Sequence, residues 1–298
     1  MSVAWGVTHD PTVGASADNA AEGRLSGATV EANVLAVMLM VAIVFAGSLT
    51  LVLRRRLPLA SAVLASAAVI GLIAFFATLS RGGVVSFVAV LLIGLVYGGR
   101  LRPAILALTL AAIVIGGVYV TTSPAAAERL SRESTSGRSD IWTVAGRMVK
   151  ANPVLGVGSG NFTTVEAHYL LYPGGIERDD LILDRPRVAH NVYLHVLAEM
   201  GVVGLCLFIG VIATAIGSAV RAVGLFRARG QPSLELLGRA IVIALIGILV
   251  ADFFSSEQYS KQLWLLLAMG PALLAIARQG SSLDVVAHPV TSSPAAVV

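Results

Sequence analysis

The chain has 298 residues, of which 56% are hydrophobic and only 13% are charged, and its mean hydropathy is +0.85. A domain folded in water needs more polar surface than this composition supplies, so a soluble protein is excluded and a membrane protein is indicated. The formal net charge of +4 comes from basic residues spread through the loops, which does not suggest binding to nucleic acid. The single cysteine, Cys206, excludes an internal disulfide and a cysteine-based metal cluster.

Seven apolar runs approach or exceed the length needed to cross the hydrocarbon core of a bilayer, which is about 20 helical residues. Backbone amides inside lipid must be hydrogen bonded within their own segment, so such runs are expected to be α-helices. The predicted fold class is therefore all-α: a polytopic transmembrane helical bundle of about seven spans, with one large external loop that contains an interfacial helix. The runs are 34–53, 57–79, 84–99, 103–122, 192–220, 236–254 and 262–277.

Arginines beside the short connections predict the orientation of the bundle. If the spans alternate, ten arginines fall on one side, whereas the short segments of the other side carry only Arg24, Arg81 and Lys261. Positive charge marks the cytoplasmic side, so we expect a multi-pass protein of the inner (cytoplasmic) membrane with its amino terminus outside. The ten are Arg54, Arg55, Arg56, Arg100, Arg102, Arg221, Arg227, Arg229, Arg239 and Arg278.

The long segment between the fourth and fifth spans is the main external feature. A connection of this length is either functional or disordered. Within it, apolar residues recur at three-to-four spacing over 139–151, which predicts a helix suited to the membrane interface. The predicted organisation is an external amino-terminal segment, four spans, a large external loop, three spans and a disordered cytoplasmic tail, with bounds 1–33, 34–122, 123–191, 192–277 and 278–298.

A titratable imidazole, His190, stands where the external loop re-enters the bilayer. Because the ordinary pKa of histidine lies near neutrality, His190 is a candidate base that activates a hydroxyl. The alternative interpretation is a histidine that caps the following helix. Farther along, His195 and Glu199 lie four residues apart on one helical face, which predicts an internal polar pair that supports packing.

Two external arginines are candidate ligands for an anion. Arg81 is followed by two glycines that permit close backbone approach, and its planar guanidinium suits a phosphate or a carboxylate. Arg138 opens the predicted loop helix, where free backbone amides also favour an anion. Together they suit a diphosphate held without a metal. The alternatives are an ion-paired or snorkelling residue for Arg81 and a solvated first-turn residue for Arg138.

Two other stretches of the loop are less informative. The run 152–162, which contains Asn-Pro and three glycines, predicts a helix stop followed by a turn that brings backbone close to something at the outer surface. It lacks the glycine spacing and the strand of a dinucleotide site. Four acidic residues offer a candidate metal site, but they alternate with arginines and favour a solvated, self-neutralised loop. They are Glu177, Asp179, Asp180 and Asp184.

The order of these motifs resembles the O-antigen ligase and polymerase family of bacterial membrane proteins, over about residues 24 to 275. Each motif alone is weak, and their succession and external placement make the combination specific. The motifs are Arg24-Leu-Ser-Gly27, Ala32-Asn33-Val-Leu-Ala36, Ser80-Arg81-Gly82-Gly83, Gly137-Arg138 with Trp142, Asn152-Pro153 through Phe162, and His190-Asn191 followed by Gly201-x-x-Gly204.

The resemblance implies a glycosyltransferase that moves a glycan from an undecaprenyl-diphosphate carrier to a hydroxyl of a glycan, lipid or protein acceptor. It implies no metal, no other cofactor and no nucleotide sugar, with membrane lipids as the surroundings. Carried over motif by motif, it makes Arg81 and Arg138 ligands of the carrier diphosphate and His190 the base. Both ligation and polymerisation stay open.

Two departures from the family pattern leave alternatives open. Family members usually carry more spans at the amino end, and the stretch 28–32 is less aromatic than is common. Either the native polypeptide begins further upstream, or the first span inserts with its amino end outward unaided. The competing functions are an inactive carboxy-terminal fragment, a transporter or a non-catalytic membrane scaffold. A transporter predicts polar residues inside several spans, where this chain offers little beyond His195 and Glu199.

Overall fold

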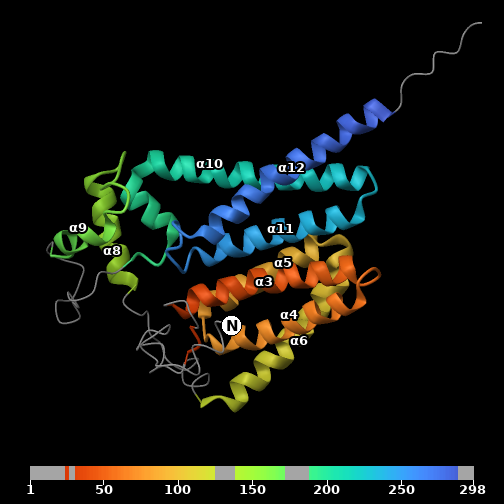
Figure 1. The fold of residues 1–298 in the computed structure, drawn as a ribbon. Helices are drawn as coiled ribbons and strands as arrows, with labels where there is room; N and C mark the ends of the chain where they lie inside the picture. The colour runs from red at the N-terminus through yellow and green to blue at the C-terminus, as the bar shows by residue number, and fades with distance from the viewer. Residues whose placement is uncertain (1–23, 27–30, 125–137, 172–187, 288–298) are drawn as a thin grey trace, which may run out of the picture.

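The structure, a computed structural model, describes residues 24–26, 31–124, 138–171 and 188–287. All regular structure in these ranges is helical, which confirms the predicted all-α fold class (Figure 1). The helices are α3 (Ala32–Leu53), α4 (Pro58–Ala77), α5 (Arg81–Tyr97), the 3-10 turn η1 (Gly99–Leu101), α6 (Arg102–Thr122), α8 (Arg138–Ala151), α9 (Phe162–Leu170), α10 (Val192–Ala228), α11 (Pro232–Ala251) and α12 (Lys261–Ala287).

Each of the seven predicted spans coincides with a helix. Six of these segments are long and apolar enough to cross a membrane, namely α3, α4, η1 with α6, α10, α11 and α12. The remaining one, α5, is apolar and has 17 residues. The chain is therefore a multi-pass membrane protein. One boundary differs: α12 runs to Ala287, so part of the tail that was predicted as disordered is helical.

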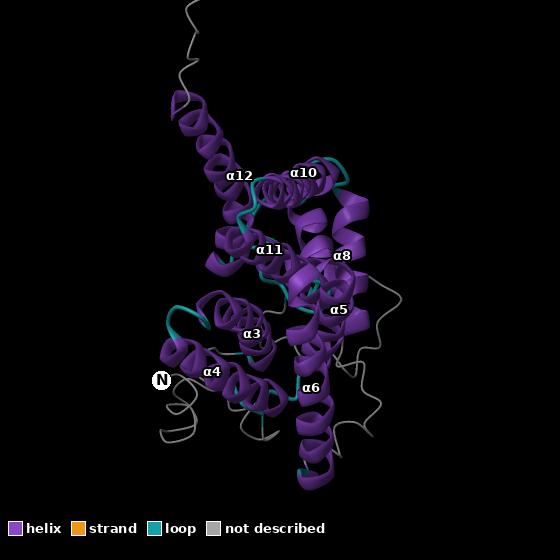
Figure 2. Ribbon diagram, turned by 90° about the vertical axis from the view of Figure 1, so that its right-hand side faces the viewer, coloured by secondary structure: helices purple, strands orange, loops and turns teal. Residues whose placement is uncertain are grey.

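Helix α11 is the centre of the bundle. Of its most apolar stretch, 61% is buried inside the protein, against 11–33% for the other membrane-spanning segments. It lies between α10 and α12 on one side and α3 on the other (Figures 1 and 2). Gly247 lets these helices approach, because a Cβ there would lie 2.4 Å from Val90 of α5 and 3.0 Å from Met40 of α3. Helix α6 is the least buried and presents apolar side chains outward, as a lipid-facing helix does.

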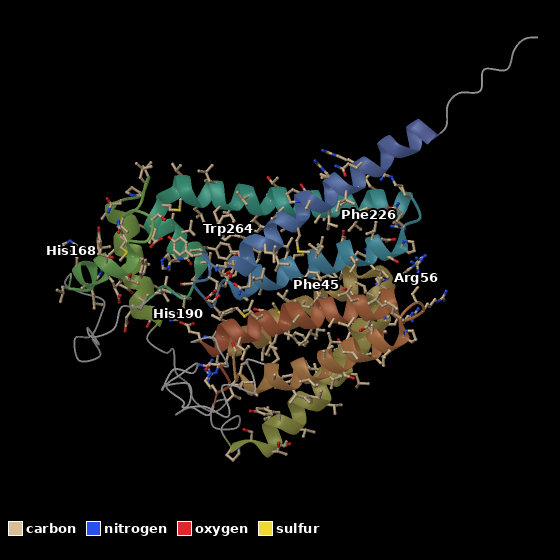
Figure 3. All side chains as sticks on the ribbon, viewed as in Figure 1. Phe45, Arg56, His168, His190, Phe226 and Trp264 are labelled. Carbon is tan, nitrogen blue, oxygen red and sulfur yellow. The ribbon has the colours of Figure 1, made fainter. Side chains whose placement is uncertain are left out.

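The connections of the bundle fall at two opposite ends. Figure 3 shows Arg56 at one end and His190 at the other. The turns after α3, α5 and α10 meet at the first end, which we call the arginine end and which carries Arg54, Arg55, Arg56, Arg100, Arg102, Arg227 and Arg229. Helices α8 and α9 lie at the opposite end, which we call the site end.

The predicted loop helix exists as α8, and its apolar face is covered by protein. Ile141, Val144, Ala145 and Met148 are all buried in a cluster with residues of α9 and α10. Trp142, whose side chain is 43% exposed, donates its indole N–H to the carbonyl of Ala189 at 2.9 Å. The amphipathic spacing therefore reflects packing against α10, and α8 holds the segment that enters this helix.

Helix α10 is broken at Gly201, whose φ of 65° and ψ of −167° lie outside the helical region. A break inside a membrane helix leaves backbone donors and acceptors that need partners. The turn after α8 supplies them. The N–H groups of Val202 and Val203 donate to the carbonyls of Pro153 and Val154 at 2.9 and 3.3 Å.

The same turn also pairs with the carbonyls on the other side of the break. The N–H groups of Val157 and Gly158 donate to Ala198 and Glu199 at 3.0 and 2.8 Å. The two backbones touch, because a Cβ on Gly156 would lie 2.3 Å from the carbonyl carbon of Glu199. The glycine-rich turn was predicted to bring backbone close to something at the outer surface, and the structure shows that this partner is α10.

Substitution of Gly201 tests this contact. In Gly201→Ala, the Cβ would lie 2.1 Å from the carbonyl oxygen of Val154 and would sit on a backbone conformation that favours glycine. We expect a loss of about 2 kcal/mol or more of stability, seen as a lower unfolding temperature in detergent. Gly210→Ala in the same helix is the control, since its Cβ meets nothing within 4 Å and it gains helix propensity. Equal unfolding temperatures for the two variants would show that the break does not constrain the fold.

Candidate functional site

His190 precedes Asn191 at the entry of α10 and is not the residue that caps this helix. Asn191 is the N-cap, because its side-chain oxygen accepts from the N–H of Leu194 at 3.0 Å. His190 is half-buried and has a φ of 48°, a left-handed conformation that non-glycine residues rarely adopt. Strain of this kind persists only where surrounding contacts impose it, and it is concentrated at functional sites.

The backbone on both sides of His190 is fixed by other elements. The carbonyl of Ala189, which is fully buried, accepts the Trp142 hydrogen bond from α8. On the other side, the N–H of Val192 donates at 2.8 Å to the carbonyl of Asp252, the C-cap residue that follows α11. The imidazole of His190 is thus attached to a backbone held between α8 and the segment 252–260 that joins α11 to α12.

Arg81 is the first residue of α5 and is exposed at the site end. The preceding Ser80 caps the helix by accepting from Gly83 N–H at 3.0 Å, and its hydroxyl donates to Asn33 of α3 at 2.8 Å. The amide oxygen of Asn33 also accepts from Arg24 at 3.0 Å. The residues before Arg81 are therefore built into the junction of α3, α4 and α5.

The glycines after Arg81 serve packing between helices. A Cβ on Gly82 would lie 2.5 Å from the Cβ of Phe254, and one on Gly83 would lie 2.9 Å from Ala36 of α3. These glycines therefore admit protein neighbours, where the sequence pattern had indicated room for a ligand. The contact with Phe254 places Arg81 beside the segment 252–260, which also holds the backbone after His190.

Arg138 is the first residue of α8, as predicted, although its side chain lies outside what the structure describes. Helix α8 is tied to the entry of α10 through Trp142 and through its buried face. The three candidate residues thus come from three helix starts at one end of the bundle. The acidic residues Glu177, Asp179, Asp180 and Asp184 lie outside the described residues.

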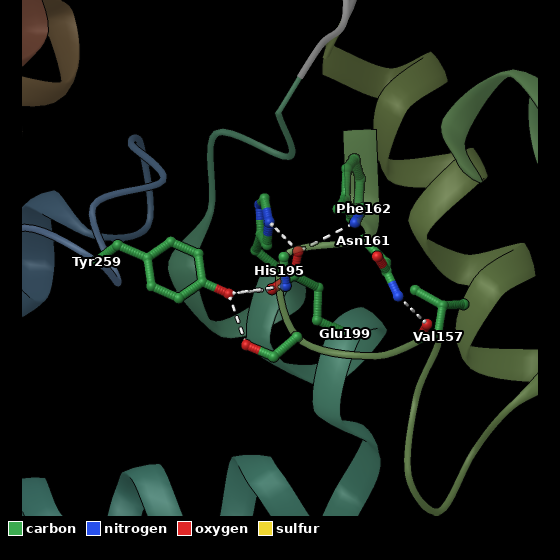
Figure 4. Close-up of polar contacts among 8 residues, drawn as sticks. Val157, Asn161, Phe162, His195, Glu199 and Tyr259 are labelled. Atoms are coloured by element: carbon green, nitrogen blue, oxygen red, sulfur yellow. Dashed lines mark hydrogen bonds and ion pairs between the residues drawn. The ribbon is translucent and has the colours of Figure 1, made fainter. Parts of the chain in front are cut away.

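The predicted pair of His195 and Glu199 is confirmed and belongs to a larger network (Figure 4). Glu199 Oε1 lies 3.2 Å from His195 Nε2 and accepts from the N–H of Phe162 at 3.0 Å. The ring of Phe162 stacks on that of His195 with centroids 4.5 Å apart. The other carboxylate oxygen accepts from the hydroxyl of Tyr259. One buried carboxylate therefore joins α9, α10 and the segment 252–260.

Tyr259 extends the network to the glycine-rich turn. Its hydroxyl lies 3.1 Å from the hydroxyl of Ser159 and accepts from the N–H of Gly160 at 3.1 Å. Burial, followed by the hydrogen bond to the Glu199 carboxylate, raises the pKa of Tyr259 above its usual value. The hydroxyl consequently stays protonated and keeps donating to Glu199.

Asp252 is a buried carboxyl that sequence analysis did not assign to the site. The residue is only 1% exposed, and neither of its carboxyl oxygens has a hydrogen-bond partner within the described part of the chain. Burial, and then the nearby charge of Glu257, raises the pKa of Asp252 to about 8. The carboxyl of Asp252 is therefore mostly protonated at neutral pH, and the backbone carbonyl of the same residue accepts the hydrogen bond that fixes the entry of α10.

Within the described residues, no group of three histidine, cysteine, aspartate or glutamate side chains is arranged to hold a metal ion. The groups available for chemistry are the imidazole of the strained His190, the exposed guanidinium of Arg81 and the start of α8, whose first residue is Arg138. Such a set suits proton transfer beside a bound anion.

The raised pKa of Asp252 predicts how stability depends on pH. The folded protein holds this proton from the ordinary value of 3.8 up to about 8, so the free energy of unfolding should fall as pH rises through that window. Asp252→Asn keeps the shape and removes the titration. We expect this variant to be more stable than the wild type at pH 8, with the difference shrinking toward pH 4.5.

Thermal unfolding in detergent across pH 4.5–8.5 measures this effect, with Asp140→Asn in the first turn of α8 as the control. Burial also raises the pKa of Glu257, so a residual slope of the same sign should remain in the Asp252 variant. A slope identical to that of the wild type would contradict the assignment to Asp252.

Comparison with known proteins adds a family to this geometry. A model of the O-antigen ligase family matches residues 66–209, from the middle of α4 to beyond the break in α10. The matched segment contains Arg81, Arg138 and His190, together with Gly201 and the turn 153–158 that pairs with the break in α10. No curated protein matches the chain at a significant level. This match confirms the resemblance found in the sequence motifs: residues 66–209 of the chain are similar to the O-antigen ligase family.

Proposed function

We propose that this membrane protein is a glycosyltransferase that moves a glycan from an undecaprenyl-diphosphate carrier to an acceptor hydroxyl in surface polysaccharide assembly. The observation that carries the proposal is the meeting of three helix starts at the site end, those of α5, α8 and α10, which bring Arg81, Arg138 and His190 to one end of the bundle. The family match supports an enzyme of the O-antigen ligase type.

In the proposed reaction, His190 takes the proton of the acceptor hydroxyl as its oxygen bonds to the anomeric carbon of the donor glycan. The bond between that carbon and the carrier phosphate breaks through an oxocarbenium-like transition state, and the electron pair leaves with the diphosphate. Arg81 and Arg138 would stabilise the charge that develops on the diphosphate. The proton resides on His190 and the negative charge on the carrier, so the step is balanced without a metal.

The fixed backbone of His190 favours the role of a base over that of a solvated side chain with no part in the reaction. Bonds on both sides of His190 hold its backbone, and its positive φ restricts where the imidazole can lie. A base held in one place lowers the entropic part of the barrier to proton transfer. A residue that merely covers the membrane surface needs no such constraint.

The orientation of the bundle also belongs to the proposal. The arginine end should face the cytoplasm of the cell whose inner membrane holds the protein, as the positive-inside rule requires. The site end then faces outward, where the acceptor and the carrier-linked glycan meet.

A transporter is less well supported by the described spans. The buried ionisable side chains within them are His195 and Glu199, and these are paired with each other near the site end. A substrate path would need polar groups along several spans.

Removal of the proposed base is the direct test. His190→Ala should lower transfer by about 10²-fold or more, because general base catalysis contributes on that scale. The measurement is the profile of finished and lipid-linked glycan in cells whose only copy is the variant, at matched membrane abundance. His168→Ala, an exposed histidine of α9, is the control and should leave the profile unchanged. An unchanged profile for His190→Ala would eliminate the assignment.

Exchange of arginine for lysine tests the anion site. Arg81→Lys and Arg138→Lys keep the charge and lose the planar pair of donors, so both variants should remain impaired, by about tenfold or more. Transfer by the purified protein, measured against the concentration of lipid-linked donor, is the assay. Arg55→Lys at the arginine end is the matched control. Full activity in both test variants would assign Arg81 and Arg138 to solvated positions.

A further inference from the structure

A polar cleft of about 630 Å³ opens at the arginine end, far from the site described above. It lies between the connection from α5 to α6 and the connection from α10 to α11. Its charged lining consists of Arg100, Arg102, Arg227, Arg239 and Glu235. Four guanidinium groups and one carboxylate give this cleft a formal charge of +3.

Arg239 and Glu235 form the fixed part of the cleft. Two nitrogens of Arg239, Nε and Nη2, donate to the same oxygen of Glu235 at 3.0 and 2.8 Å, and Nη1 donates to the carbonyl of Tyr97. The guanidinium also lies over the ring of Tyr97, 5.0 Å from its centroid. The only carboxylate of the lining is thus engaged by Arg239 and does not neutralise the other three arginines.

The remaining arginines are exposed around the opening. Arg102 donates to the carbonyl of Val96 at 3.0 Å, which folds it back over the end of α5. The guanidinium groups of Arg100 and Arg227 make no hydrogen bond or ion pair within the described part of the chain. Their guanidinium forks are available to a ligand with several acceptor oxygens, which is the chemistry of a phosphate group.

The orientation rule alone does not explain this arrangement. It requires positive charge near the connections, and Arg54, Arg55 and Arg56 meet that requirement on an exposed turn. In the cleft, by contrast, arginines from two connections that are distant in sequence line one concavity with a polar surface. Basic pockets between helix ends at one membrane face are suited to lipid headgroups.

An apolar cavity lies next to the cleft. Leu101 is buried and lines this cavity of about 330 Å³ among α3, α4, α5 and α6. It is the last residue of η1 and lies between Arg100 of η1 and Arg102, the first residue of α6. Its other lining side chains include Leu72 and Ile105. A basic cleft beside an apolar cavity matches an amphiphile with a phosphate head, and it matches free phosphate less well.

We propose that the cleft at the arginine end binds the headgroup phosphate of an anionic phospholipid from the surrounding leaflet, with an acyl chain against the apolar surface beside Leu101. The bound lipid would join the α5–α6 connection to the α10–α11 connection. This site is independent of the transfer chemistry proposed for the opposite end.

The test uses the full chain, purified in a non-ionic detergent and titrated with phosphatidylglycerol, with retained lipid measured by native mass spectrometry. Arg100→Gln with Arg227→Gln should weaken binding about fivefold for each arginine removed. Arg55→Gln with Arg56→Gln makes the same change in net charge at the same end and should leave binding within about twofold of the wild type. If the first double variant does not purify as a single species, Arg227→Gln alone carries the comparison.

Three results would overturn the proposal. Equal losses in the two double variants would show diffuse attraction to the arginine end. Equal binding of phosphatidylcholine and phosphatidylglycerol by the wild type would show that charge is not recognised. Displacement of the lipid by millimolar inorganic phosphate would show that the cleft holds free phosphate.

Discussion

The site depends on one backbone contact, the insertion of the turn 153–158 into the break of α10 at Gly201. Four main-chain hydrogen bonds cross this contact, two on each side of the break. They make it possible for a membrane helix to change direction without leaving backbone groups unpaired. They also fix α8 and α9 against the bundle, and through Trp142 of α8 they determine where His190 stands. The position of His190 therefore depends on the contact between this turn and α10.

The buried carboxylate of Glu199 stabilises this contact further through hydrogen bonds of its side chain. It receives a backbone N–H from α9, the imidazole of His195 and the hydroxyl of Tyr259. A carboxylate with fully assigned donors in a buried position makes a rigid junction, whereas one left unpaired would be costly. Asp252 is the opposite case, because its carboxyl has no partner within the described part of the chain and keeps its proton to about pH 8. The two acids thus stand within the same region in different protonation states.

The spans were predictable because hydropathy depends on composition alone, and their helical form follows from the need to pair every amide in lipid. The identities of Arg81, Arg138 and His190 came from motifs and from the resemblance to a family. Other features had no such signal. Nothing local to Asp252 distinguishes it from any acid at the end of a span, and the role of Gly156 follows only from its contact with Glu199, more than forty residues away. The capping of α10 by Asn191 also required the structure, since sequence analysis named His190 as the candidate for capping this helix.

The central position of α11 has a consequence for how the protein is assembled during synthesis. Helices insert into the membrane in chain order, and their side-by-side association follows insertion. When α3 and α5 are in place, the faces that carry Met40 and Val90 still lack the helix that covers them, because α11 begins more than 130 residues after α5 ends. Lipid must occupy that groove until α11 arrives and displaces it. The first four spans therefore form a groove that α11 has yet to fill. If synthesis stops before α11, lipid stays at the position that becomes the centre of the finished bundle.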